Sequence, residues 1–263
     1  LLKDTTLSET TYVKDEKNIT LNLGETEDTA HKITATDDNV QGFNIYNGSL
    51  NVTGYGSVIA EGKSGEAFIV IGNNDANTWE QPIASVLTIG ANVTVVSEND
   101  CCVYHYGNGA VTNVYGSLTS NGSYATIQGQ GTINATMNNS GTKVNIYEGA
   151  SVVCTTREAI YQPEIGELTI SGGSITGVTT GVEVRRGTLN ISGVTVESTA
   201  KTFINGTNTS GSNGPTTTGA AVAIAPHGAV NSLGNEINVN ITGGNLKGYY
   251  GLYQSDPDRY LSS

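Results

Sequence analysis

This sequence has few basic residues and no long apolar run. It carries 12 lysines and arginines against 24 acidic residues, which gives a net charge of −12 at neutral pH. Binding to a nucleic-acid backbone normally needs a basic surface, so nucleic acid is not the expected partner. A helix that crosses a membrane needs roughly 18 or more apolar residues in a row. No such run occurs, so direct membrane insertion is not expected.

Cysteine is also scarce, with only Cys101, Cys102 and Cys154. An odd number of cysteines cannot pair fully, and adjacent cysteines rarely bridge because the peptide between them must distort. Neither a CxxC motif nor clustered histidines accompany them, which argues against a metal site. We therefore expect three small apolar side chains in the core.

A short phrase that alternates apolar and polar residues returns along the chain, and each copy predicts a strand with one buried face. The copies lie at residues 50–54, 87–90, 112–116, 144–147, 168–172, 189–193 and 239–243. Successive copies are 21 to 50 residues apart, and the shorter steps match one turn of a solenoid. No stretch keeps a helical apolar period, so a long helix is not expected.

Two further apolar segments follow each copy, and the second of them opens with a small residue. These third strands are expected at residues 67–69, 102–104, 125–127, 159–161, 181–184, 221–224 and 251–253. Three strands per turn, separated by Gly, Asn or Ser corners, are typical of a parallel β-helix, and parallel crossovers are nearly always right-handed. The sequence thus predicts an all-β, right-handed parallel β-helix (solenoid) of about seven three-strand coils.

The repeat also predicts the domain organisation. Residues 1–45 fit it poorly, and we expect an irregular N-terminal cap and first partial coil there. Residues 46–263 form a single β-helix domain with inserted loops at 73–82 and 201–219. The last coil reaches Tyr253, so further domains are expected in the full-length protein.

The polar positions of the recurring phrase should form a column on the outer face of the solenoid: Asn51, Thr88, Asn113, Asn145, Thr169, Asn190 and Asn240. The next outward rank includes Tyr115 and Tyr147. Stacked amides and hydroxyls can hydrogen-bond along the axis and stabilise the ladder. Alternatively, this polar face with its two tyrosines offers a surface on which a sugar chain could lie.

The third strands provide the preferred candidate site. Their outward column is expected to contain Ile69, Tyr104, Ile127, Tyr161, Glu183, Ala223 and Tyr253, flanked by Tyr106, Glu158, Arg185 and Arg186. Exposed aromatic rings beside charged hydrogen-bonding groups are typical of carbohydrate recognition. The alternative is that a cap, a loop or a neighbouring domain covers this face.

Trp79, in the first inserted loop, is a further candidate ligand-binding residue, because it could stand as an exposed platform or staple the loop to the body. Asp75, Asn77 and Glu80 carry oxygens of the type that bind calcium, so calcium is a secondary possibility beside the expectation of no cofactor.

No paired aspartates fall within a repeat strand, as a polysaccharide hydrolase would require, so the sequence favours a protein without catalytic residues.

Short motifs link the C-terminal half to a known group of proteins. Residues 169–173 read Thr-Ile-Ser-Gly-Gly, residues 239–244 read Val-Asn-Ile-Thr-Gly-Gly, and residues 255–261 read Ser-Asp-Pro-Asp-Arg-Tyr-Leu. They resemble the repeat blocks of repetitive, adhesin-like β-helix surface proteins of gut Firmicutes. The resemblance implies a secreted or cell-surface bacterial module that is followed by more repeats and an anchor. It does not extend to the N-terminal third.

Three functions therefore remain open. The preferred one is an extracellular, adhesin-like module without catalysis that binds a polysaccharide, a host glycan or a glycoprotein through the tyrosine-bearing face. The second is a polysaccharide lyase or glycoside hydrolase of the pectin-lyase-like type. The third is a structural stalk without a ligand.

Overall fold

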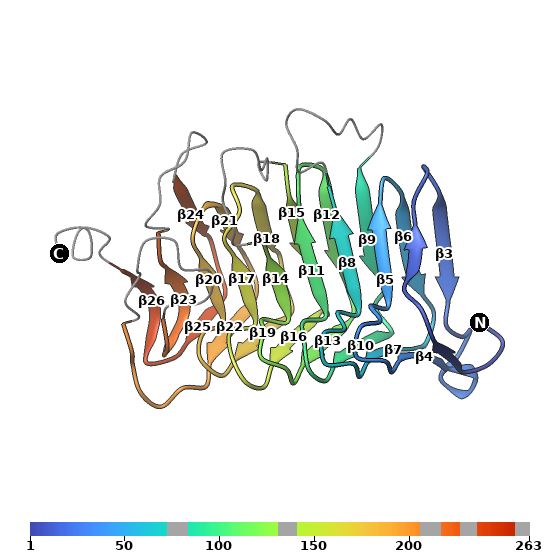
Figure 1. Ribbon diagram of the computed structural model, residues 1–263. Helices are drawn as coiled ribbons and strands as arrows, with labels where there is room; N and C mark the ends of the chain where they lie inside the picture. Colours follow the sequence, from blue (N-terminus) through green and yellow to red (C-terminus); the bar gives the residue numbers. More distant parts are fainter. Residues whose placement is uncertain (73–83, 131–140, 206–216, 227–235, 256–263) are drawn as a thin grey trace.

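A computed structural model describes residues 1–72, 84–130, 141–205, 217–226 and 236–255 (Figure 1). In these residues the chain winds into a right-handed parallel β-helix, and each turn adds one strand to each of three sheets, A, B and C. The fold class predicted from the repeat is confirmed. The single helical element in the described residues is the 3₁₀ turn η1 (Glu27–Thr29), and no helix there is long and apolar enough to span a membrane.

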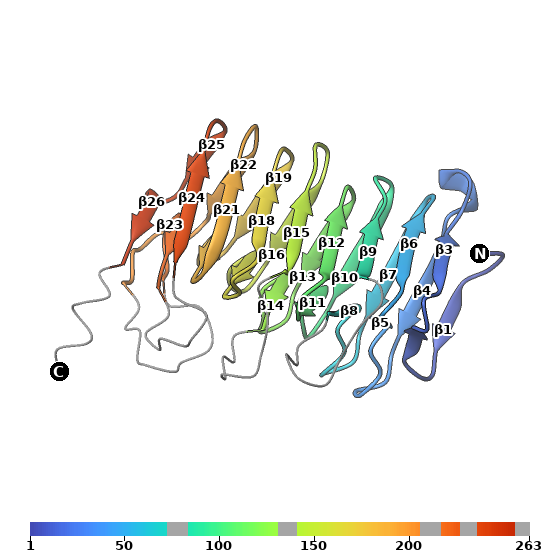
Figure 2. The same ribbon diagram turned by 90° about the horizontal axis from the view of Figure 1, so that it is seen from above.

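The strands of each sheet are all parallel and follow one another at intervals of three along the chain (Figure 2). Sheet A contains β1 (Thr5–Leu7), β4 (His31–Ala35), β7 (Gly56–Ala60), β10 (Val93–Ser97), β13 (Ser117–Ser120), β16 (Ser151–Cys154), β19 (Ser174–Gly177), β22 (Thr195–Ser198) and β25 (Asn245–Lys247). Sheet B contains β2 (Thr11–Val13), β5 (Phe43–Tyr46), β8 (Phe68–Ile71), β11 (Val103–Tyr106), β14 (Ile127–Gly129), β17 (Ile160–Gln162), β20 (Val182–Val184), β23 (Ala220–Ile224) and β26 (Tyr250–Gln254). Sheet C contains β3 (Asn18–Asn22), β6 (Ser49–Thr53), β9 (Ser85–Ile89), β12 (Ala110–Val114), β15 (Lys143–Ile146), β18 (Glu167–Ile170), β21 (Gly187–Ile191) and β24 (Ile237–Ile241).

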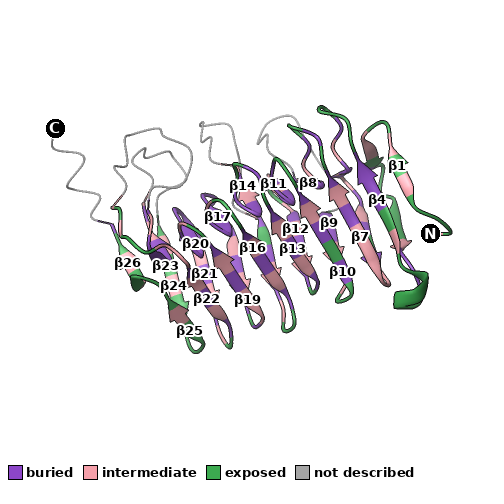
Figure 3. Cartoon of the chain, turned by 90° about the horizontal axis from the view of Figure 1, so that it is seen from below, coloured by how far each residue is buried: buried purple, intermediate pink, exposed green. Residues whose placement is uncertain are grey.

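The inner positions of all three sheets form one continuous apolar core of stacked Val, Ile and Leu side chains (Figure 3). Burial alternates along each strand, as in β12, where Ala110, Thr112 and Val114 are buried and the residues between them are not. Each fully buried aliphatic side chain contributes roughly 1.5–3 kcal/mol to folding, so stacking supplies the stability that no single coil could supply. The three cysteines are free and buried, as predicted.

Glycine shapes the corners between sheets C and A. Gly54 and Gly173 have φ angles of +78° and +82°, in the left-handed region that favours glycine. A side chain at Gly173 would also collide with the backbone of Ala150 in the preceding coil. These corners therefore let the chain turn sharply while the coils stay one strand spacing apart.

The N-terminal region differs from the expectation of an irregular cap. Residues 1–45 already carry strands β1 to β4 and most of β5, and these pair in parallel with the strands of the following coil. Sheets A and B consequently contain nine strands each, whereas about seven coils were expected. The early strands were missed because β1 and β2 are only three residues long and partly exposed, which leaves little apolar alternation to recognise.

Three of the inserts that lie outside the described residues leave from the same edge of the solenoid. Residues 73–83, 131–140 and 227–235 each connect a strand of sheet B to the next strand of sheet C. The expected loop at 201–219 connects β22 to β23 on a different edge, between sheets A and B. Its described base is closed by an antiparallel bridge between Ile204 and Thr218, with N···O distances of 3.0 and 2.9 Å.

Candidate functional site

The predicted site residues lie on the outer face of sheet B. The strand register places one column down this face: Asn44, Ile69, Tyr104, Gln128, Tyr161, Glu183, Ala223 and Tyr253. The column predicted from the sequence is confirmed except for Ile127, which points into the core and is fully buried. The corner from Ser120 to Ile127 is one residue longer than its neighbours, and a shift of one residue moves a strand's side chains to the other face.

The N-terminal part of this face is a partly exposed aromatic surface, which we call the tyrosine strip. It consists of Asn44, Tyr46, Ile69, Ile71, Tyr104 and Tyr106 on strands β5, β8 and β11, all partly exposed except Ile69, which is 6% exposed. The rings of Tyr104 and Tyr106 lie 5.5 Å apart with an angle of 53° between their planes. Burial raises the pKa of both phenols, so both keep their hydroxyl proton at neutral pH.

The C-terminal part of the face is covered, contrary to the prediction of an exposed surface. Tyr161, Glu183 and Arg185 each have 0% exposure. Arg185 donates from Nε to the carbonyl of Ala225 (3.1 Å) and from Nη1 to the hydroxyl of Tyr161 (3.3 Å). The backbone N–H of Thr217 donates to Oε2 of Glu183 at 3.1 Å. The backbone on either side of β23 therefore hydrogen-bonds to Arg185 and Glu183, and Arg185 in turn hydrogen-bonds to Tyr161.

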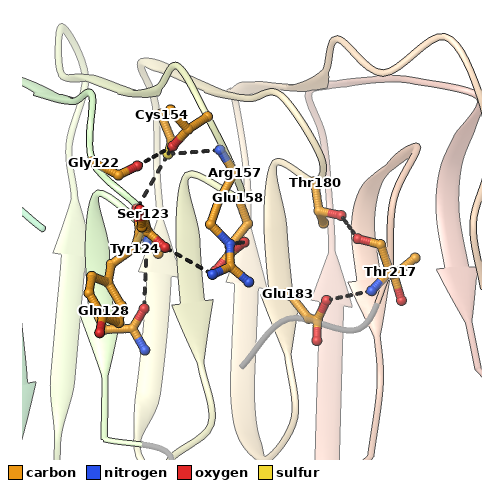
Figure 4. Close-up of polar contacts among 12 residues, drawn as sticks. Gly122, Ser123, Tyr124, Gln128, Cys154, Arg157, Glu158, Thr180, Glu183 and Thr217 are labelled. Atoms are coloured by element: carbon orange, nitrogen blue, oxygen red, sulfur yellow. Dashed lines mark hydrogen bonds and ion pairs between the residues drawn. The ribbon is translucent and has the colours of Figure 1, made fainter. Parts of the chain in front are cut away.

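Glu158 lies at the corner between sheets A and B and is also buried, with 1% exposure (Figure 4). Its Oε2 atom lies 3.7 Å from Nε of Arg157, and Nη1 of Arg157 donates to the carbonyl of Ser123 at 2.9 Å. Burial raises the pKa of Glu158 to about 7, and the charge of Glu183 adds to this shift. At neutral pH this carboxyl group can therefore either donate or accept a proton.

Arg186, the last flanking residue named from the sequence, is buried as well, with 1% exposure. Burial and then the neighbouring charge of Arg185 lower its pKa to about 10. It therefore remains a cation at neutral pH. Its burial removes it from the set of surface groups that a ligand could contact.

Tyr253 shares the column with Tyr104 but is separated from it by four positions of the column. Its ring packs against Phe203 and Tyr250, with centroids 4.6 and 5.6 Å away. The tyrosines thus form two separate groups, and Tyr253 belongs to an aromatic cluster at the C-terminal end. Trp79 lies outside the described residues.

The calcium possibility also concerns residues outside the described part of the chain, because Asp75, Asn77 and Glu80 lie within 73–83. Among the residues that the structure describes, no group of three or more His, Cys, Asp or Glu side chains is arranged to hold a metal ion. Paired acidic and basic groups do occur, notably Nδ1 of His105 at 3.1 Å from Oε2 of Glu164 inside the solenoid. Burial lowers the pKa of His105 to about 4 and raises that of Glu164, which favours the uncharged forms of both.

The outer face of sheet C carries the amide column that the sequence predicted, in the predicted register. Asn145 donates to the side-chain oxygen of Asn113 at 3.0 Å, and Asn240 donates to that of Asn190 at 2.9 Å. The predicted hydrogen bonds between stacked amides are therefore present, and their contribution to stability stays a prediction.

Sequence reasoning missed two groups on sheet B. The first is Asn44 and Tyr46 on β5: Asn44 falls in the expected cap and Tyr46 at the start of the expected β-helix, and neither was predicted as part of the column, although residues 43–46 alternate apolar and polar as a strand does. Gln128 was displaced from the column by the one-residue error at Ile127; its Oε1 accepts from the backbone of Ala125 at 3.4 Å. The alternation at 43–46 and the length of the corner before β14 were the signals available.

Comparison with protein-family models, with curated proteins and with solved structures finds no match to this chain. A fold alone does not define a function. The functional argument therefore depends on the chemistry of the two outer faces just described.

Proposed function

We propose that the protein is an adhesin-like module of a bacterial cell surface that binds glycans without catalysing a reaction, and that the tyrosine strip is its binding surface. The ligand is a polysaccharide or a host glycan. This agrees with the resemblance of the repeat motifs to bacterial surface proteins.

One observation carries the proposal: Tyr104 and Tyr106 present two adjacent, partly exposed rings on a regular sheet face. Aromatic rings contact the C–H faces of sugars, and neighbouring polar groups hydrogen-bond to the hydroxyls. Asn44 supplies such an amide on β5, and Gln128 lies next to Tyr104 in the column, with its own amide bonded to the backbone of Ala125 and Gly129. No residue of the strip is charged, which suits a neutral ligand better than an anionic one.

A glycan array probed with the whole chain tests this function. Tyr104→Ala and Tyr106→Ala should each reduce binding at least tenfold, because each removes one stacking surface. Tyr161→Phe is the matched control, since it removes only a buried hydroxyl on the same column. Thermal unfolding confirms that each variant is folded. Unchanged array profiles in both alanine variants would refute the assigned surface.

A second candidate, glycoside hydrolysis, is favoured by Glu158 and Glu183. Glycosidases use one carboxyl group as an acid with a raised pKa and another as a carboxylate. Glu158 has a pKa of about 7, raised in part by Glu183, so the two fulfil the electrostatic requirement. Their burial argues against it, because a substrate would have to displace the backbone at Thr217.

Release of reducing sugars from a panel of plant and bacterial polysaccharides distinguishes the two functions. If the protein is a hydrolase, the unmodified chain should release reducing sugars. Glu158→Gln and Glu183→Gln should each abolish this turnover, although both variants leave the tyrosine strip unchanged. The absence of turnover together with glycan binding supports the first proposal. The absence of both leaves the structural stalk as the remaining function.

A further inference from the structure

A surface groove of about 480 Å³ runs along the corner between sheets C and A, on a different side of the solenoid from the tyrosine strip. We call it the corner groove. It is lined by Glu27, Ala30, Tyr55, Gly56, Ser57, Ala91, Asn92, Val93, Thr94 and Ser117. These residues come from four successive corners, so the groove follows the axis of the solenoid.

The floor of the groove repeats one chemical group from coil to coil. Ser57, Thr94 and Ser117 pair in register on neighbouring strands of sheet A, so their hydroxyls form a row with the strand spacing of about 4.8 Å. Asn92 adds an exposed amide beside this row. Hydroxyl and amide groups both donate and accept hydrogen bonds, as do the hydroxyls of a sugar.

Aromatic rings mark both ends of this row. Tyr55 lines the groove two residues before Ser57, and Tyr115 lies just beyond the lining residues, two residues before Ser117 and two coils further along the solenoid. The ring of Tyr115 stacks on that of Tyr147 in the next coil, with centroids 4.2 Å apart and planes within 3°. Tyr115 is 37% exposed.

The stacking determines which face of Tyr115 is free. Since the two rings are parallel and one coil apart, the second face of Tyr115 is directed toward the preceding coil. The equivalent position there is Gly90, because Tyr115 N bonds to Ile89 O as Gly90 N bonds to Val52 O. Glycine has no side chain to cover the ring. The second face of Tyr115 is therefore directed toward the corner that begins at Gly90, and two residues of that corner, Ala91 and Asn92, line the groove.

The charge of the lining limits the ligand. Glu27 is the one charged residue among those that line the groove, and exposed Glu148 follows Tyr147. Acidic side chains repel uronate sugars, whereas a neutral sugar chain needs only rings and hydrogen bonds. No lysine or arginine lines the groove in the described structure to compensate an anion.

We propose that the corner groove is a second carbohydrate site, which binds a neutral oligosaccharide lying along the solenoid axis. Tyr55 and Tyr115 stack on sugar rings at either end, and Ser57, Thr94, Ser117 and Asn92 hydrogen-bond to hydroxyls between them. Tyr147 positions Tyr115 by stacking on its other face. This site does not depend on the tyrosine strip.

Calorimetric titration of the whole chain with cellohexaose, xylohexaose and mannohexaose, and with hexagalacturonate as the anionic counterpart, tests the proposal. At least one neutral hexaose should bind, and hexagalacturonate should bind at least tenfold more weakly. Tyr115→Ala and Tyr55→Ala should each weaken binding at least tenfold, whereas Tyr115→Phe should retain it. Thr94→Trp, at an exposed strand position, should block the groove without removing either ring.

Matched variants distinguish binding at the corner groove from binding at the tyrosine strip. Tyr106→Ala should leave hexaose binding in the groove unchanged, and Tyr115→Ala should leave the glycan-array signal of the strip unchanged. The groove proposal is overturned if no neutral hexaose binds, if hexagalacturonate binds best, or if Tyr55→Ala, Tyr115→Ala and Thr94→Trp all bind as the unmodified chain does. The strip is tested separately, by the effect of Tyr104→Ala and Tyr106→Ala on the glycan array.

Discussion

The outer faces of sheets B and C are built on the same parallel ladder but carry opposite chemistry. The solvent-facing side of sheet C carries a column of neutral amides and hydroxyls. Amides in this column hydrogen-bond to the equivalent amides one coil away. Sheet B holds Tyr161, Glu183 and Arg185 in or beside one column, and all three are buried. A parallel ladder places each residue above its equivalent, so neutral self-complementary groups stack freely, whereas charged groups need partners from elsewhere.

The strongest test of this difference is Arg185→Met, which keeps the volume of the side chain but removes its donors. The hydroxyl of Tyr161 and the carbonyl of Ala225 would each lose the hydrogen bond from Arg185. Loss of a partner costs each of these two buried groups roughly 1–3 kcal/mol, so the free energy of unfolding should fall by about 2–6 kcal/mol. Urea denaturation measures it.

The matched control is Arg157→Met, because the side chain of Arg157 is 39% exposed. Its partner Glu158 is buried, but the guanidinium of Arg157 is partly solvated, so its loss should lower the unfolding free energy less than the loss of the fully buried Arg185. Equal destabilisation by the two variants would contradict the view that the covered face depends on its buried cation.

The second test uses pH. The pKa of Glu158 is raised to about 7 from 4.5, so the folded state holds the proton more tightly than the unfolded state does. Its contribution to stability is fully present below pH 4.5 and is lost as the pH rises through 7. Glu158→Gln avoids this loss and should gain stability relative to the unmodified chain between pH 4.5 and 8. The gain should be on the order of 3 kcal/mol.

The difference in unfolding free energy between the variant and the unmodified chain isolates this carboxyl group from others that titrate, such as His105. Glu148→Gln changes an exposed glutamate on the sheet C side and serves as the control. The pH profile of Glu158→Gln is compared with that of this variant at an exposed site. A flat profile for Glu158→Gln as well would show that Glu158 is not held in a desolvated position.

The two faces also differ in how far they could be predicted. The column through Asn113 and Asn145 could be predicted from the repeat alone. The apolar and polar residues alternate visibly within each strand, and the parallel register aligns equivalent residues of neighbouring strands. The burial of Glu183 could not be predicted in this way. Its cover includes the backbone of Thr217, which is 34 residues away and outside any repeat strand. Gln128 was missed because a corner longer by one residue reverses the alternation.

The mildest test concerns the amide ladder itself. Asn145 is partly buried in the middle of sheet C and donates to Asn113, whereas Asn240 is exposed on the last strand and donates to Asn190. Asn145→Ala should lower the unfolding free energy by about 1 kcal/mol, the usual net value of a hydrogen bond. Asn240→Ala should lower the unfolding free energy by only a few tenths of the loss caused by Asn145→Ala, because water replaces the lost hydrogen-bond partner at this exposed end of the sheet. If the two losses are equal, the ladder bonds contribute independently of their position, and the stability of sheet C does not arise from stacking between neighbours.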